Sequence, residues 1–159
     1  MNQPNEQPVD VELQVSGNYH GDVIAWATEQ AALLRAGQFD ELDIENIAEE
    51  IESLGISERR QFENRLIVLL THLLKQEYQL ELMPNASWER TIKDQQRRLQ
   101  RLIRKTPSLK PSLIDPEVID DVWSDATKKA SEETGLFIEK FPEECPYDFH
   151  QVIYAEDEE

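Results

Sequence analysis

The sequence predicts an all-α protein, a single-domain bundle of four to five helices around one long central helix. Three observations lead to this prediction. Leu, Glu, Arg and Ala recur at helical spacing through most of the 159 residues, and only five residues are glycine. β-Branched residues rarely alternate with polar ones, as they would in exposed strands. The segment from Arg65 to Lys75 is the most apolar in the chain and needs to be covered.

That apolar segment belongs to the predicted central helix, Ser57 to Leu82. On a helical wheel its apolar side chains fill an arc of about 180°, whereas a surface helix needs a stripe only slightly wider than about 100°. A helix with so wide an apolar arc requires neighbours on two or more sides, which a bundle supplies. The continuous apolar part is far shorter than the roughly 20 residues that cross a bilayer, so we expect no membrane helix. The side chains of the arc are Phe62, Leu66, Ile67, Leu69, Leu70, Leu73, Leu74 and Tyr78.

Two shorter helices are predicted before the central one, from their caps. Asp22 begins the first, and Gly37 ends it after Ala36. Asp43 begins the second, and Gly55 ends it before Ser57 opens the central helix. The faces predicted to be buried are Ile24, Ala27, Ala31 and Leu34, with Trp26 and Leu33 beside them, in the first helix, and Ile44, Ile47, Ala48, Ile51 and Leu54 in the second.

Two further helices are predicted after Met83-Pro84-Asn85 closes the central one. Ser87 is expected to cap a helix that ends in a loop between Pro107 and Pro111. Asp115 followed by Pro116 opens the last helix, which Gly135 ends. The chain beyond it is expected to form an irregular strap. Trp26, Trp88 and Trp123 have core spacing within their helices, so all three are predicted to pack inside.

These elements place a helical-bundle domain at residues 19–150, between an N-terminal tail (1–18) and an acidic C-terminal tail (151–159). Residues 9–16 alternate apolar and polar side chains, a strand pattern with no sheet to join, so they form either a mobile tail or a segment that pairs with a partner chain. The beginning of the chain lacks a secretory signal, and the single Cys145 fits a reducing compartment. We therefore expect a cytoplasmic protein.

The formal charge of −17 is unevenly distributed. Residues 87–110 alone are positive, with eight Lys or Arg against two Asp or Glu. Five of these cations fall on one side of the predicted helix, opposite Trp88, Ile92, Leu99 and Ile103: Arg90, Lys93, Arg97, Arg101 and Arg104. Such a row can be solvated, can pair with Glu117, Asp120, Asp121 and Asp125 on the last helix, or can bind an acidic partner protein. Nucleic acid is disfavoured because the chain as a whole is acidic and Trp88 faces away from the row.

A second group of polar residues is a strip of carboxylates, Glu45, Glu49 and Glu52, on one edge of the second helix. With a histidine from a neighbouring helix, of which His72 is the obvious candidate, such a strip could hold a divalent metal. No Glu-x-x-His pair accompanies them, so the diiron pattern is incomplete. The alternative is that the strip is solvated or pairs with Arg59, Arg60 or Arg65, and that His72 is an ordinary boundary residue.

Catalytic motifs are otherwise missing. The sequence has no glycine-rich phosphate loop, no His-Glu-x-x-His segment and no nucleophile motif. Cys145 lies between Glu144 and Pro146, without a neighbouring cation to lower the pKa of its thiol. We therefore predict no cofactor and no catalytic residues.

Seven blocks of the sequence carry a resemblance to a known family: residues 33–40 (Leu33 to Asp40), 43–55 (Asp43 to Gly55), 72–75 with Tyr78 and Gln79, Ser87-Trp88, 107–109, 133–136 and 141–147 (Phe141 to Tyr147). In this order they resemble domain-of-unknown-function family twenty-nine, a group of helical bacterial proteins frequent in cyanobacteria. The resemblance covers about residues 19–150 and implies an all-helical fold and a bacterial origin, without an established activity. This chain has Gln76 where the family usually carries Trp.

Taken together, these features predict a helical protein-protein interaction module with an unidentified protein partner. The acidic body, the segregated basic row and the alternating N-terminal segment are typical of proteins that dock on others. Homo-oligomerisation stays open. The alternative function is a metal-dependent hydrolase that uses Glu45, Glu49, Glu52 and His72.

Overall fold

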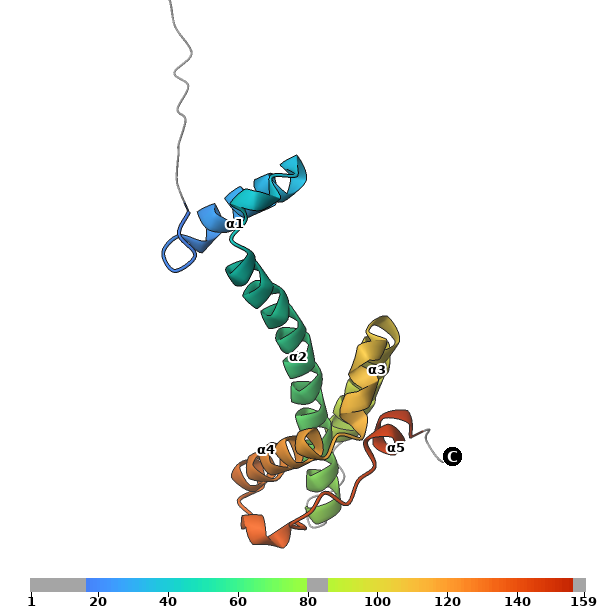
Figure 1. Ribbon diagram of the computed structural model, residues 1–159. Helices are drawn as coiled ribbons and strands as arrows, with labels where there is room; N and C mark the ends of the chain where they lie inside the picture. The colour runs from blue at the N-terminus through green and yellow to red at the C-terminus, as the bar shows by residue number, and fades with distance from the viewer. Residues whose placement is uncertain (1–16, 80–85, 156–159) are drawn as a thin grey trace, which may run out of the picture. The chain divides into compact units, whose positions relative to one another are not determined.

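The computed structural model describes residues 17–79 and 86–155, and its regular secondary structure in these ranges is helical, with no strand (Figure 1). The all-α prediction is confirmed. The alternating segment 9–16, Leu82 and Met83-Pro84-Asn85 lie outside the described residues. In chain order the elements are α1 (Val23–Ala36), η1 (Phe39–Glu41), α2 (Ile44–Tyr78), α3 (Ala86–Lys105), η2 (Pro107–Leu113), α4 (Pro116–Thr134), η3 (Ile138–Lys140) and α5 (Phe149–Tyr154), where η marks a 3₁₀ helix.

The chain divides into two compact units, the first ending at Leu54 and the second beginning at Gly55. We call them unit 1 and unit 2. Helix α2 contributes its N-terminal part to unit 1 and the rest to unit 2. The boundaries 1–18, 19–150 and 151–159 remain a prediction, although residues 151–154 of the expected tail are helical in α5.

Helix α2 shows that the predicted break at Gly55 is wrong. The helix runs from Ile44 to Tyr78 without interruption, so Ser57 begins no new element. The glycines with positive φ in the described chain are Gly37 and Gly135, and Gly55 keeps the helical backbone. A glycine inside a helix costs only about 1 kcal/mol relative to alanine and keeps its hydrogen bond, so good helix formers on both sides carry the helix through it.

Unit 1 is held together mainly by polar and ring contacts. The Asp22 side chain caps α1 by accepting from the backbone N–H of Ala25, and Gly37 ends the helix at φ 72°. Trp26 Nε1 donates to Asp43 Oδ2 over 2.9 Å, and the Asp43 backbone N–H donates to Gln30 Oε1 over 2.8 Å. Trp26 and Gln30 are the buried residues of α1, which confirms Trp26 as a packed residue.

The two buried faces predicted for unit 1 are wrong. In α1, Ile24 is 78% exposed and Leu34 is 45% exposed. The hydrogen bonds that link Trp26 and Gln30 to Asp43 place the side of α1 that carries these two residues against the start of α2. Ile24 and Leu34 lie on another side of the helix and stay exposed. In α2, every residue from 48 to 54 is exposed, including Ile51 and Leu54.

Unit 2 contains the hydrophobic core, and the wide apolar arc of the central helix is confirmed there. Phe62, Leu66, Leu69, Leu70 and Leu74 of α2 are each at most 1% exposed. Side chains from all the neighbouring elements cover them, as the packing of α3 and α4 beside α2 in Figure 1 indicates. These side chains are Ile92, Leu99 and Ile103 of α3, Leu109 and Leu113 of η2, Val122, Trp123, Ala126 and Ala130 of α4, Phe141, and Phe149 and Ile153 of α5.

The boundaries predicted for α4 agree with the structure, whereas the start predicted for α3 does not. Asp115 caps α4 by accepting from the Glu117 backbone N–H, and Gly135 ends it at φ 74°, both as predicted. Helix α3 already includes Ala86, so Ser87 is its second residue rather than its cap. Trp88 is half-buried, not in the core. The expected loop between Pro107 and Pro111 is the 3₁₀ helix η2.

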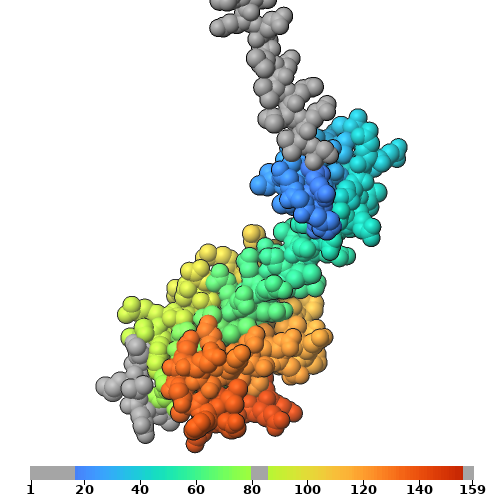
Figure 2. All heavy atoms as spheres, turned by 90° about the vertical axis from the view of Figure 1, so that its left-hand side faces the viewer, coloured from blue at the N-terminus to red at the C-terminus, as the bar shows by residue number. Residues whose placement is uncertain are grey.

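The strap after α4 is more ordered than predicted. It contains η3 and ends in the six-residue helix α5, which Asp148 caps by accepting from the Gln151 backbone N–H. Gln96 and Gln100 of α3 donate to the backbone carbonyls of Val152 and Ile153, each over 2.8 Å. These two bonds fix α5 along α3. Figure 2 shows α4 and the strap side by side on one face of unit 2.

Among the described helices, none combines the length and the apolar composition that a membrane crossing requires.

Candidate functional site

The five cations predicted on one side of α3 are all exposed, and we call this set the cationic face: Arg90, Lys93, Arg97, Arg101 and Arg104. The opposite side of α3 buries Ile92, Leu99 and Ile103 and carries the two glutamines that bind α5. Within the described residues, the four arginines of the face have no ion pair and no hydrogen bond. The four guanidinium groups therefore lie on one side of an ordered helix without an ionic partner in the described residues.

The acidic outer side of α4 does not neutralise these arginines. Glu117, Asp120, Asp121 and Asp125 are all exposed, and no ion pair among the described residues joins them to the four arginines. Two ion pairs within the described residues involve other side chains, Arg98 Nε to Asp94 Oδ2 at 2.7 Å and Lys75 to Glu133. Pairing of the cationic face with α4 inside the fold, one of the predicted alternatives, is thus absent for its arginines.

The metal site predicted from Glu45, Glu49, Glu52 and His72 receives no support. The three glutamates are exposed and belong to unit 1, whereas His72 belongs to unit 2. His72 Nδ1 lies 2.8 Å from the backbone carbonyl oxygen of Val68, one turn earlier in its own helix. No group of three or more His, Cys, Asp or Glu side chains in the described residues is arranged to hold a metal ion.

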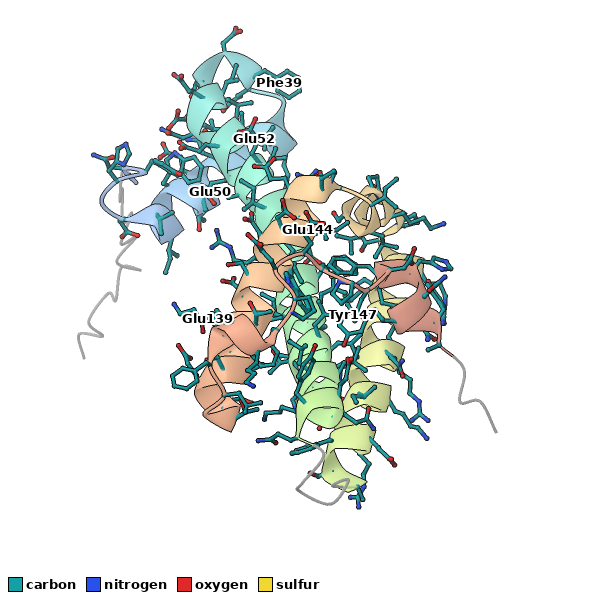
Figure 3. The ribbon with its side chains drawn as sticks, turned by 90° about the horizontal axis from the view of Figure 1, so that it is seen from below. Phe39, Glu50, Glu52, Glu139, Glu144 and Tyr147 are labelled. Atoms are coloured by element: carbon teal, nitrogen blue, oxygen red, sulfur yellow. The ribbon has the colours of Figure 1, made fainter. Side chains whose placement is uncertain are left out.

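A groove of about 900 Å³ between α4 and the strap was not predicted from the sequence. Buried Trp123 and Phe141 line it, and Trp123 Nε1 donates to the carbonyl oxygen of Pro142 over 3.0 Å, which ties the strap to α4. Figure 3 marks Glu139 and Glu144 on the strap. The remaining lining residues are Pro116, Ile119, Asp120, Ser124, Thr127, Ile138, Glu143 and Cys145. The aromatic and proline residues of the strap are the sequence signal that this segment packs on the domain. They did not predict the groove, because helical periodicity does not show how an irregular segment folds back on α4.

Two side chains of the strap, Cys145 and Tyr147, are held in their neutral forms by a raised pKa. Burial raises the pKa of the Cys145 thiol, despite a contact of its Sγ with the Tyr147 carbonyl oxygen at 3.6 Å. Burial, with a 2.6 Å hydrogen bond that its hydroxyl donates to Glu77 Oε2, raises the pKa of Tyr147 well above its usual range. A protonated thiol is a poor nucleophile, so these surroundings do not activate Cys145.

The ion pair between Lys75 and Glu133 predicts a pH dependence of stability. A hydrogen bond from the Lys75 ammonium lowers the pKa of Glu133 below its ordinary value of 4.5. A carboxyl whose pKa is depressed by folding stabilises the fold above its unfolded pKa, and this contribution is lost as the pH falls through the folded pKa. Because Glu133 is 36% exposed, we expect a contribution of at most about 1 kcal/mol.

Glu133→Gln is therefore expected to lower the melting temperature slightly at pH 7. The difference from the wild type is expected to shrink once the pH falls below about 4.5 and to vanish below the folded pKa of Glu133. Thermal melts from pH 7 to pH 3 measure this. Glu132→Gln, at an exposed neighbouring position, serves as the control. A wild-type difference that is the same at every pH would contradict the assignment.

The family model for the domain of unknown function DUF29 matches residues 18–156, nearly the whole chain. Searches of curated proteins and of solved structures give no match. The resemblance seen in the sequence blocks is thereby confirmed, and the chain belongs to the DUF29 family, a domain of unknown function.

Proposed function

We propose that this protein is an interaction module that binds an acidic protein through the cationic face of α3. The observation that carries the proposal is that Arg90, Arg97, Arg101 and Arg104 are exposed on one side of a single helix, with no ion pair inside the described chain. An arginine binds a carboxylate through two parallel N–H···O bonds, so a row of arginines on one face suits a surface that presents several Asp or Glu.

The way in which α3 is held supports this role. Its inner side is fixed by three buried side chains and by the bonds from Gln96 and Gln100 to α5. A partner therefore meets side chains whose backbone is already ordered, and binding loses less conformational entropy than it would on a mobile loop.

An acidic protein fits the face better than nucleic acid does. The chain carries a formal charge of −17, which repels a polyanion at long range. Proteins that bind single strands stack bases on exposed aromatic side chains. The aromatic residue of α3, Trp88, is half-buried with the Lys75 ammonium 6.0 Å from its ring centre. It does not supply such a platform on the cationic face.

The proposal is tested by affinity capture with three forms of the full chain. These are the wild type, Arg97→Glu with Arg101→Glu, and the matched charge reversal Lys110→Glu with Lys128→Glu at exposed positions outside the cationic face. A genuine partner is expected to bind the wild type and the matched control and to be lost from the arginine variant. With the purified partner, calorimetry at low and high salt is expected to show at least a tenfold weaker affinity for the arginine variant and a clear loss with salt.

Two outcomes would overturn the proposal. One is that no captured protein distinguishes the arginine variant from the matched control. The other is that the material captured through Arg97 and Arg101 is nucleic acid, shown by its removal with nuclease.

A further inference from the structure

The groove between α4 and the strap combines an apolar lining with negative charge on both of its walls. Its volume of about 900 Å³ lies within the range of sites that hold a small molecule, roughly 300 to 1,000 Å³. Trp123, Phe141 and Ile138 supply large apolar surfaces to the lining. The lining also contains four exposed carboxylates, which we call the acidic rim: Asp120 on α4, and Glu139, Glu143 and Glu144 on the strap.

The acidic rim is not neutralised by the protein itself. None of its four carboxylates forms an ion pair or a hydrogen bond within the described residues. The charge of Asp120 on α4 contributes to the raised pKa of the Cys145 thiol on the strap, so the negative charge of one wall acts on the other across the groove. A cation that enters the groove therefore meets unpaired carboxylates from both sides.

The carboxylates of the rim are spread along the groove and do not converge on one point. Figure 3 shows Glu139 and Glu144 at separate points of the strap. No group of three or more acidic, histidine or cysteine side chains in the described residues is arranged to hold a metal ion. Spread charge of this kind suits an elongated ligand with several positive groups better than a single metal ion.

Hydrogen-bond acceptors greatly outnumber donors among the side chains of the groove. None of the described lining residues is Lys, Arg, His, Asn or Gln. Trp123 Nε1 already donates to the Pro142 carbonyl oxygen, and the Thr127 hydroxyl, 3.0 Å from the Trp123 carbonyl oxygen, already bonds within its own helix. A carboxylate, a phosphate or a peptide backbone carries acceptors that would find few partners here, and an unpaired acceptor weakens binding. The groove therefore selects a ligand that donates hydrogen bonds and accepts none.

We propose that this groove binds a linear aliphatic polyamine, whose ammonium groups meet the acidic rim and whose methylene chain packs on Trp123, Phe141 and Ile138. A protonated amine donates hydrogen bonds without accepting any, and its positive charge suits carboxylates. Its methylene segments separate the charges and match the apolar lining between the two walls. This inference is independent of the proposed function, because the cationic face lies on α3 and binds the opposite charge.

Calorimetry with the full chain at low salt tests the inference with three trivalent cations. Spermidine is the polyamine. Hexaamminecobalt(III) has the same charge and only N–H donors but lacks methylene groups, and acetyl-trilysine amide carries the same charge on a peptide backbone. Spermidine is expected to bind at one site, with an affinity at least about tenfold higher than that of either comparison cation.

A pair of charge variants locates the binding. The first changes the three strap glutamates of the acidic rim to Gln and is expected to weaken spermidine at least about tenfold. The matched control removes the same charge from exposed positions of unit 1, by changing Glu45, Glu49 and Glu52 to Gln. It is expected to leave the affinity within about twofold. Circular dichroism is expected to show unchanged helicity in both variants, since every altered side chain is exposed.

A second pair of variants tests the apolar lining. Ile138→Ser is expected to weaken spermidine about fivefold, because Ile138 lines the groove and its loss removes contact with the methylene chain. The same change is expected to leave hexaamminecobalt(III) unaffected. Ile114→Ser, at an exposed position outside the groove, is the matched control and is expected to leave both cations unchanged.

Three outcomes would overturn the inference. Binding of hexaamminecobalt(III) as tight as that of spermidine, or equal weakening by the two charge variants, would reduce the effect to general attraction between a cation and an acidic chain. Tighter binding of acetyl-trilysine amide than of spermidine would make a basic segment of a protein the occupant. The absence of spermidine binding at concentrations up to about 1 mM would leave the groove without a polyamine ligand.

Discussion

Replacing Leu66 with alanine is expected to lower the free energy of unfolding by about 3 to 5 kcal/mol. Leu66 is fully buried in the core of unit 2, where side chains from α2, α3 and α4 meet. The change removes apolar surface from the core and leaves a cavity, because the surrounding helices are held by many other contacts and relax only in part. Urea unfolding followed by far-ultraviolet circular dichroism measures the loss.

Helix α2 provides a matched control for this prediction. Leu54→Ala is the same chemical change on the same helix, but Leu54 is 66% exposed, so we expect an effect within about 0.5 kcal/mol. Comparable losses at the two positions would contradict the exposure described for Leu54.

Replacing Trp123 with alanine is expected to be similarly destabilising, by about 3 to 5 kcal/mol. Trp123 is 4% exposed, its ring centre lies 5.8 Å from that of Tyr147, and its Nε1 donates to the carbonyl oxygen of Pro142. The side chain therefore holds the strap on α4 as well as filling the core. Hydrogen exchange is expected to show faster exchange in residues 138–147 in addition to the global loss.

Phenylalanine at the same position separates the two roles of Trp123. Trp123→Phe keeps an aromatic ring but leaves the Pro142 carbonyl without its partner, so we expect a loss of about 1 to 3 kcal/mol. Trp88→Phe, at a half-buried position of α3, is the matched control and is expected to cost less. If Trp88→Phe destabilises the chain as much as Trp123→Phe, the bond to Pro142 has no special role in holding the strap.

The sequence was most informative where one local signal decides the backbone. Asp22 and Asp115 mark the two helix starts because their carboxylates satisfy free backbone N–H groups of the first turn. Gly37 and Gly135 mark two ends because both adopt positive φ, which other residues resist. The same reasoning failed at Gly55, where a glycine that can end a helix is also tolerated inside one.

Burial was predictable only where a helix has neighbours on several sides. Leu66 to Leu74 fill an arc too wide to be left exposed, and they form the core. Ile24 and Ile51 have the same helical spacing as core residues, yet both are exposed, because periodicity shows which residues share a face and does not show what covers that face. Helix α5 was not predicted. Its signals in the sequence are the cap residue Asp148 and the apolar spacing of Phe149, Val152 and Ile153, but a helix of six residues is too short to give a clear periodic pattern.

For the polar surfaces, too, helical periodicity predicts which residues share a side of a helix but not which elements lie next to each other. The position of Arg97 and Arg101 on one exposed side of α3 follows from helical periodicity alone and agrees with the structure. Whether Glu45 lies near His72 depends on the tertiary arrangement, which periodicity does not give. No group of three or more candidate metal ligands is found among the described residues. The groove beside Trp123 depends on the path of the strap, which no periodic pattern encodes.

The half-buried Cys145 gives this chain a built-in reporter. It is the single cysteine of the sequence, and its thiol lines the groove with a raised pKa. A thiol reagent reacts with the thiolate through the groove, so the rate of labelling measures how accessible the groove is. Because no other thiol competes, a ligand that closes the groove can be detected in the unmodified protein as slower labelling, without any introduced probe.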